Sequence, residues 1–228
     1  MDSGKLYLIP TPIGNMGDIS ERSIEILKEV EIIACEDTRH SGRLLNKLEI
    51  RKKLISYHEF NEEARASQLI DIMKQGSSVG VISDAGSPGI SDPAYRVVKA
   101  AIDNDITVVP LPGANSIIPA LTASGLPTDR FFFEGFLPNK SGARKTRLGK
   151  LIDFPHTIIF FESPHRIIKS LNDILEVFGD RSACVAREIT KLHEQFIRGN
   201  VSEILERVGE SVKGEIVIVI AGAPKKKN

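Results

Sequence analysis

Short apolar segments alternate with longer helix-like segments through the first half of the chain, and this alternation constrains the fold most. Apolar runs at 6–9, 31–34, 53–56, 79–83 and 106–109 are typical of buried strands. Amphipathic patterns at 20–30, 62–75 and 93–103 predict helices between them. Strands separated by helices of this size favour a mostly parallel α/β sheet.

The second half has a different pattern. Strand-like runs lie at 131–133, 157–161, 183–186 and 216–220, and residues 188–197 could form the arm of a hairpin. A helix is predicted from Pro164 to Phe178, with Ser163 as its N-cap and Gly179 after its end. Pro112 and Gly113 separate the halves. We therefore predict an N-terminal α/β domain at 1–113 and a C-terminal α/β domain with a mixed sheet at 114–228.

Composition excludes several classes of protein. The 228 residues include 30 Lys and Arg against 30 Asp and Glu, so the overall charge indicates no nucleic-acid or membrane partner. No apolar run reaches membrane length and the N-terminus is too polar for a signal peptide, which favours a cytoplasmic location. Cys35 and Cys184 lie in apolar runs without CxxC or Cys/His spacing. Buried free thiols are expected, and no metal site.

Three polar loops rich in Gly and Pro follow strands of the first half. They cover residues 10–15, 83–89 and 110–116, and Asp92-Pro93 after the second loop is a helix-start signal. In a parallel sheet such loops gather at the carboxyl edge, where ligands bind. Neither a GxxxxGK[ST] loop nor a GxGxxG fingerprint is present, which disfavours nucleotide triphosphates and dinucleotides.

Charged residues also follow strands directly. Glu36, Asp37 and Arg39 come after one strand, and such positions point toward a ligand cleft. Residues 139–147 hold four cations and are predicted to be a flexible basic loop. This loop is equally consistent with simple solvation and with contacts to RNA phosphates.

Eight motifs together resemble one known family. They are PTPIGN, ACEDTRHSGRLL, ISYHEFNE, SDAGSPGISDP, PLPGANS, SGLPTDRFFFEGFLP, FFESPHR and AREITKLHEQFIRG. The chain is similar, from residue 6 to about 222, to the ribosomal RNA small subunit methyltransferase I family of the tetrapyrrole methylase superfamily. The resemblance implies a homodimer of two-domain subunits with S-adenosylmethionine in the cleft between the domains. It also implies 2′-O-methylation of a cytidine ribose in the decoding region of small-subunit (16S) rRNA, free or within the 30S subunit.

The same resemblance implies which residues bind the cofactor. Those expected to do so are Pro12, Gly14, Asp84, Gly86, Ser87, Pro88, Asn115, Ser116, Phe161, Glu162, Arg187, Gly214, Glu215 and Ile216. Two positions depart from the superfamily pattern, because Asn15 replaces an acid in the first loop and Ser87 stands where many relatives have Asp. Longer members of the family also continue well past the GEIVIVI strand.

Methyl transfer from a sulfonium needs alignment of the nucleophile and help in removing its proton. The candidate bases are Asp37, Glu36, His58, Glu162, Glu188 and Lys191. Asp37 ranks first, followed by Glu188 and Lys191, and Lys191 would need a depressed pKa. Residues expected to contact the substrate RNA are Arg39, His58, Lys140, Arg144, Lys145, Arg147 and Arg166. Two alternatives stay open. A small-molecule, tetrapyrrole-like methylase predicts a large apolar pocket, and a non-catalytic RNA- or ribosome-binding module predicts no binding of S-adenosylmethionine.

Overall fold

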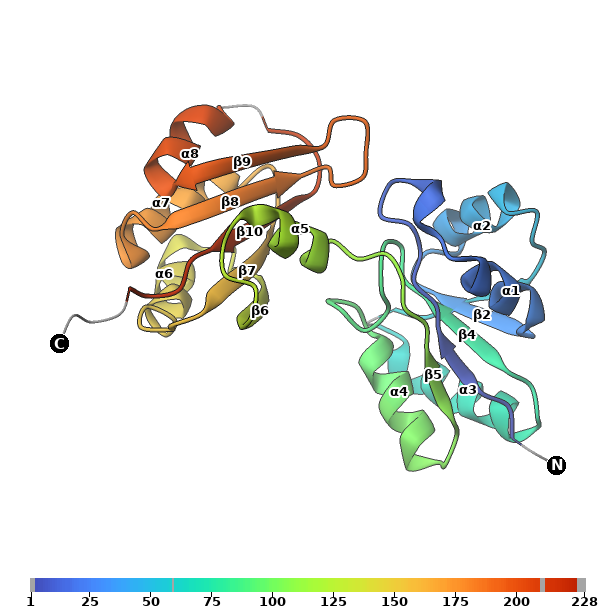
Figure 1. Cartoon of the computed structure of the whole chain (residues 1–228). Helices are drawn as coiled ribbons and strands as arrows, with labels where there is room; N and C mark the ends of the chain where they lie inside the picture. The colour runs from blue at the N-terminus through green and yellow to red at the C-terminus, as the bar shows by residue number, and fades with distance from the viewer. Residues whose placement is uncertain (1–2, 59, 210–211, 225–228) are drawn as a thin grey trace. The chain divides into compact units, whose positions relative to one another are not determined.

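The computed structural model describes residues 3–58, 60–209 and 212–224. The chain divides into two compact units, Met1–Asn115 and Ser116–Asn228, so the division falls two residues after the predicted boundary. Each unit holds one five-stranded sheet within the described residues, as Figure 1 shows. The predicted fold class, two α/β domains with a parallel and then a mixed sheet, is confirmed.

The first sheet is entirely parallel, with strand order β3-β2-β4-β1-β5. Its strands are β1 (Leu6–Leu8), β2 (Ile32–Cys35), β3 (Lys53–Ser56), β4 (Val79–Ile82) and β5 (Val108–Pro110). The central strands β2 and β4 are buried along their whole length. Burial on both faces explains why these segments are continuously apolar rather than alternating.

Helices cover both faces of this sheet. Leu27 of α1 (Glu21–Glu29) and Leu45 of α2 (Thr38–Lys47) belong to one apolar cluster. Leu69 of α3 (Glu62–Lys74) and Val97 of α4 (Ala94–Asp103) belong to the cluster on the other face. The chain therefore leaves β4 toward one face, while it leaves both neighbours, β1 and β2, toward the other. Ligand sites of open α/β sheets lie at such a switch point, outside the carboxyl ends of the strands.

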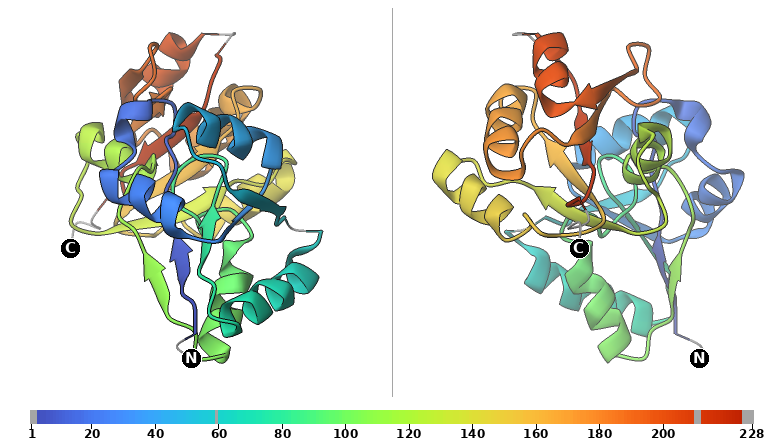
Figure 2. Two further views of the ribbon diagram at one scale, coloured as in Figure 1. Left: turned by 90° about the vertical axis from the view of Figure 1, so that its right-hand side faces the viewer. Right: turned by 60° about the vertical axis from the view of Figure 1, so that its left-hand side comes forward.

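The second sheet is mixed, with order β6-β7-β10-β8-β9. Strands β6 (Phe131–Phe136) and β7 (Thr157–Glu162) are parallel, whereas β8 (Ser182–Arg187), β9 (Gln195–Asn200) and β10 (Ile216–Ile220) pair antiparallel. Helices α6 (Ser141–Gly149), α7 (Ile167–Phe178) and α8 (Val201–Val208) contribute to one apolar cluster and lie in a row in Figure 2. Helix α5 (Ile117–Ser124) packs against β10 and β8.

Two predictions in the second unit are wrong. The basic segment is not a flexible loop, because residues 141–149 form α6. Helix α7 begins at Ile167, three residues later than predicted, and Ser163 is not its N-cap. The Ser163 hydroxyl accepts instead from the backbone N–H of His165 in a preceding turn, at 3.3 Å. Helices α2 and α8 were not predicted at all.

Candidate functional site

The three Gly/Pro loops of the first unit are tied together at the carboxyl edge of the sheet. Thr11, after β1, pairs with Gly86, after β4, through two backbone hydrogen bonds of 2.9 and 3.0 Å. The Thr11 hydroxyl donates to the carbonyl of Ser83, and the Ser83 hydroxyl donates to that of Gly86, both at 3.0 Å. Two loops that are far apart in sequence thus form one braced structure.

The third loop, after β5, joins the same structure. The Ser87 hydroxyl donates to the carbonyl of Ala114 at 3.1 Å. Gly86 has φ +86°, and a Cβ at this position would come within 3.3 Å of Ile13 and 3.8 Å of the Asn115 Cα. Glycine is needed here both for the backbone angle and for the close approach of the other two loops. The sequence placed these loops together correctly.

Asp37 serves as the N-cap of α2. Its Oδ1 accepts from the backbone N–H groups of Arg39 at 2.7 Å and His40 at 3.4 Å. The hydrogen bond from the Arg39 N–H is the main reason that the pKa of Asp37 is lowered. The Arg39 side chain is 89% exposed. The first-ranked base is therefore a weaker base than an ordinary aspartate.

The pKa of Glu36, the preceding residue, is shifted in the opposite direction. Burial, followed by the nearby charges of Asp84 and Asp92, raises the pKa of its carboxyl. Asp84 also reaches the start of α2, where its Oδ1 accepts from the Asp37 N–H at 3.4 Å. Its position directly after a buried strand marks Glu36 as a candidate base in the sequence, but Asp37 was ranked above it.

In the second unit, Glu162 ends β7 with a fully buried side chain. Its Oε1 lies 2.7 Å from Arg166 Nη2 and accepts from the Ser163 N–H at 2.7 Å, while Oε2 accepts from the Ser170 hydroxyl. These contacts occupy the carboxylate. Glu162 can therefore meet a ligand only through its backbone groups.

Glu188 and Lys191 form one ion-pair cluster with Glu215. Lys191 Nζ lies 2.9 Å from Glu188 Oε1 and 3.1 Å from Glu215 Oε2, and the Glu215 N–H donates to Glu188 at 3.1 Å. The hydrogen bond from Lys191 lowers the pKa of Glu188. Burial opposes the charge of Lys191, but its bonds to the two glutamates outweigh burial and raise its pKa. The depressed pKa that Lys191 would need as a base is absent.

Close packing next to this cluster requires glycine. Gly214 has φ +93°, and a Cβ there would lie 2.3 Å from the carboxyl carbon of Glu188. Arg187 donates to the carbonyl of Lys213 at 3.1 Å and to Gln195 at 3.1 Å. Residues 187–188 and 213–215 are thereby held as neighbouring strand ends.

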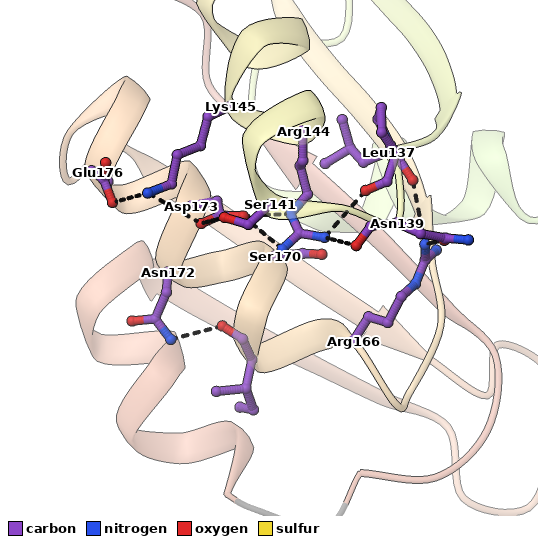
Figure 3. Close-up of polar contacts among 12 residues, drawn as sticks. Leu137, Asn139, Ser141, Arg144, Lys145, Arg166, Ser170, Asn172, Asp173 and Glu176 are labelled. Atoms are coloured by element: carbon purple, nitrogen blue, oxygen red, sulfur yellow. Dashed lines mark hydrogen bonds and ion pairs between the residues drawn. The ribbon is translucent and has the colours of Figure 1, made fainter.

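The cations of α6 are directed largely toward the protein itself (Figure 3). Arg144 is 2% exposed, contacts Asp173 at 2.6 Å, and donates to the carbonyls of Pro138 and Asn139 at 3.2 Å. The expectation that Arg144 contacts RNA is therefore wrong, because burial and internal partners use its guanidinium.

The neighbouring predicted cations also have partners. Lys145 pairs with Glu176 at 2.6 Å, Arg147 donates to Glu134 at 2.6 Å, and Arg166 is paired with Glu162 as described above. Lys140 makes no ion pair with any residue that the structure describes.

The matched family model, Tetrapyrrole (Corrin/Porphyrin) Methylases, covers residues 5–205. The chain belongs to the tetrapyrrole methylase family. It is 49% identical over 98% of its length to the Ribosomal RNA small subunit methyltransferase I of Micromonospora olivasterospora, and covers 72% of that protein. The protein of that name from Synechocystis sp. is 47% identical over 96% of this chain, which covers 80% of it. The resemblance to the rRNA small subunit methyltransferase I family is confirmed.

Solved structures share the fold at low sequence identity. The methyltransferase CobJ is 18% identical, with a TM-score of 0.70 over 99% of this chain and 97% of its own. Uroporphyrin-III C-methyl transferase from Thermus thermophilus, complexed with S-adenyl homocysteine, has a TM-score of 0.63 at 18% identity, over 95% of this chain and 97% of its own. This protein is a methyltransferase that uses S-adenosylmethionine.

Two absences hold for the part of the chain that is described. No three His, Cys, Asp or Glu side chains gather there as metal ligands would. No helix in that part combines the length and apolar composition that crossing a bilayer requires. Cys35 and Cys184 are free and buried, as predicted.

Proposed function

We propose that this protein transfers a methyl group from S-adenosylmethionine to the 2′-hydroxyl of a cytidine ribose in the decoding region of small-subunit rRNA. The observation that carries the proposal is the identity of 45–49% to proteins named Ribosomal RNA small subunit methyltransferase I, over 96–99% of this chain. The family resemblance implies the 2′ position of the ribose and the cytidine. The names of these relatives give small-subunit rRNA as the substrate.

The first-unit loops fit the methionine part of the cofactor. Gly86 and Gly89 have positive φ, and no described atom lies within 4 Å of a Cβ placed at Gly89, so a ligand can approach the chain closely there. Bound S-adenosylmethionine would supply an activated methyl group on a positively charged sulfur. We assign its contacts in this unit to Pro12, Gly14, Asp84, Gly86, Ser87, Pro88 and Asn115.

The second unit offers mainly backbone groups to the adenosine part. Its proposed contacts are Phe161, Glu162, Arg187, Gly214, Glu215 and Ile216, whereas Ser116 joins Asn115 at the methionine part. The buried and fully paired carboxylate of Glu162 supports a backbone role at that position. The left-handed turn at Gly214 supports another, because it leaves a stretch of chain without a side chain next to β10.

Alignment of the ribose hydroxyl with the methyl group then carries much of the rate, since the sulfonium is already a good leaving group. We keep Asp37 as the first candidate base and assign Glu188 and Lys191 a positioning role, because Lys191 stays protonated. Asp37→Asn tests this. Asparagine is as good an N-cap as aspartate, so a loss of kcat in a normally folded variant indicates proton transfer, and unchanged kcat leaves Asp37 only its capping role.

RNA phosphates need cations that the protein leaves exposed. Lys140 meets this condition, and so does Arg39, whose ion pair with Asp37 at 3.4 Å is open to solvent. Lys145, Arg147 and Arg166 can contribute only in competition with their glutamate partners. Charge removal at Arg39 and Lys140 is expected to lower affinity for the subunit and to reduce its salt dependence.

The test of the proposed function is transfer of a labelled methyl group to 30S subunits from a strain that lacks the protein. Mapping of 2′-O-methyl groups in 16S rRNA, with and without the protein, then identifies the nucleotide. No transfer to subunits or to naked rRNA would refute the proposal. Transfer to a tetrapyrrole instead would identify the small-molecule alternative, and failure to bind S-adenosylmethionine in calorimetry would identify the non-catalytic module.

The proposed substrate implies a cytoplasmic location, and the family resemblance implies a homodimer. Light scattering coupled to size-exclusion chromatography measures the mass directly. A species of twice the 25.0 kDa chain mass is expected, and a monomer would refute the dimer.

A further inference from the structure

A hollow lies at the carboxyl edge of the first sheet, beside the three loops that follow β1, β4 and β5. It is a pocket of about 670 Å³ whose lining includes Glu36 after β2, His58 after β3, Asp92 before α4, and the aromatic residues Phe60 and Tyr95. Strand β4 lies between β2 and β1 in the sheet. The edge is thus divided, with the tied loops at the ends of β4, β1 and β5 and this pocket at the ends of β3, β2 and β4. Its volume is in the range of small-molecule sites.

Glu36 is the carboxylate that the protein leaves available in this pocket. It makes no ion pair with any described residue, and its acidic neighbours disfavour its charge. Asp92 is occupied by contrast, because its oxygens accept from the N–H groups of Gly89 at 2.8 and 2.9 Å and of Ala94 at 2.9 Å. A half-buried carboxylate without a cation does not stabilise the fold. The backbone N–H of Asp84 already donates to this carboxylate, and a hydrogen-bond donor from a ligand would add a further partner.

His58 presents a second unsatisfied polar group. The Asn61 Oδ1 accepts from the His58 backbone N–H at 2.9 Å, and this bond fixes the orientation of the Asn61 amide. Its Nδ2 lies 3.2 Å from His58 Nε2 and can only donate, so Nε2 accepts and the neutral ring carries its hydrogen on Nδ1. That Nδ1 is buried and has no hydrogen-bond partner among the described residues.

Two aromatic rings border the pocket and are exposed to solvent. The Phe60 residue is 95% exposed and Tyr95 69%. The Phe60 ring lies edge-on to the His58 ring, at a centroid distance of 6.1 Å. Exposed rings beside polar groups are typical of sites on which nucleic-acid bases stack.

We propose that this pocket receives the base of the target cytidine, with Glu36 accepting a hydrogen bond from the cytosine N4 amino group and Phe60 or Tyr95 stacking on the ring. The proposal rests on the proposed function. Cytosine presents an amino donor where uracil presents a carbonyl oxygen, so a carboxylate attracts the first base and repels the second. The one cation among the described residues of the lining, Arg96, is paired with Glu62 at 2.5 Å. Glu36 and Asp92 therefore leave the pocket with a net negative charge. This charge disfavours an anion such as phosphate and favours a neutral base with donors.

The test compares variants in methylation of 30S subunits at several subunit concentrations. Glu36→Ala is expected to raise KM roughly tenfold with little change in kcat, whereas Glu36→Gln keeps an acceptor oxygen and stays close to wild type. Phe60→Ala is expected to raise KM about tenfold to a hundredfold, with rescue by Phe60→Trp. The matched control is Ile102→Ala, which removes an apolar side chain, 62% exposed, from the far end of α4.

Three results would overturn the assignment. Unchanged KM in both alanine variants removes the pocket from substrate binding. A collapse of kcat in Glu36→Gln with normal KM would instead make Glu36 a proton acceptor. Subunits reconstituted with uridine at the modified position provide a further measurement. Wild type is expected to prefer cytidine at least tenfold and Glu36→Ala to lose that preference, while equal use of both by wild type refutes the proposal.

A separate arm distinguishes failure of this inference from failure of the proposed function. If wild type transfers no methyl group to subunits or to naked rRNA, the proposed function fails, and the pocket is tested alone by NMR titration with free cytidine and uridine. Shifts confined to the pocket with cytidine, lost in Glu36→Ala and absent with uridine, support base recognition. No cytidine-dependent shift refutes it.

Discussion

Replacement of Arg144 by alanine tests whether this basic side chain of helix α6 stabilises the fold. Asp173 is 9% exposed and would lose its two contacts of 2.6 Å to Arg144. It would retain Ser141 at 2.9 Å and Lys145 at 3.7 Å. Removal of one member of a buried ion pair typically costs about 3–5 kcal/mol. The remaining partners of Asp173 place the expected loss of unfolding free energy near the lower end of that range, about 3 kcal/mol.

The carbonyls of Pro138 and Asn139 add little to this figure. Asn139 is exposed and Pro138 is only half-buried, so water can replace the guanidinium there. A double variant, Arg144→Met with Asp173→Leu, removes both charges and fills their space. Because apolar replacement of a whole buried pair is often neutral, the double variant is expected to be more stable than Arg144→Ala.

The measurement is urea unfolding followed by circular dichroism, with hydrogen exchange and mass spectrometry to locate the effect. Exchange is needed because the chain has no Trp and its three Tyr all lie before residue 116, so intrinsic fluorescence does not report on the second unit. Protection is expected to fall in α6 and α7 and to stay unchanged in the first unit. The control is Lys99→Ala in an ion pair that is more than half exposed, whose loss is expected to change the unfolding free energy little because solvent screens the pair. An Arg144→Ala cost as small as that of the control would refute the reasoning.

Three further predictions follow from single features. Gly214→Ala is expected to cost about 1–3 kcal/mol through backbone strain, whereas Gly142→Ala, with nothing within 4 Å, is expected to be neutral or slightly stabilising in thermal unfolding. Burial raises the pKa of Cys35, and that of Cys184 to about 11, so neither thiol should react with a disulfide reagent at pH 8 until the protein is denatured. The pKa of Glu36 is raised above its ordinary 4.5, so stability is lost as pH rises through the folded value. Glu36→Gln is therefore expected to be the more stable form at pH 8, with the difference vanishing below about pH 4.5 in paired melting curves, and a difference that grows toward low pH would contradict this sign.

The sequence predicted the central strands of the sheets well because these strands are buried on both faces. Continuous apolar runs such as those that became β4 and β10 have few alternative structures in a chain of this size. Helices failed where the pattern was polar. Helix α2 has the sequence TRHSGRLLNK and buries only Ser41 and Leu45, so no apolar stripe marks it. Sequence reasoning took its first residues for a ligand-binding loop.

The candidate site was predictable where contacts follow from topology. Three loops after parallel strands must meet at one edge, and the structure joins them through Thr11, Gly86 and Ser87. It was not predictable where the partner is distant in sequence. Arg144 looked like a free cation because Asp173 lies 29 residues away on another helix. The sequence does not show how the environments of Asp37 and Glu36 differ. The cap of α2 lowers the pKa of Asp37, whereas burial raises the pKa of Glu36.

Ser87 shows how one departure from the superfamily pattern changes the physics of a loop. A carboxylate at this position can only accept hydrogen bonds, whereas the Ser87 hydroxyl donates to the carbonyl of Ala114 at 3.1 Å. The bond joins the loop after β4 to the loop after β5, next to the place where Gly86 contacts the loop after β1. The serine therefore replaces a negative charge at the carboxyl edge of the sheet by a hydrogen bond between two of the loops there. Rigid walls lower the ordering cost of ligand binding, so the contribution of Ser87 to cofactor affinity is expected through preorganisation rather than through charge.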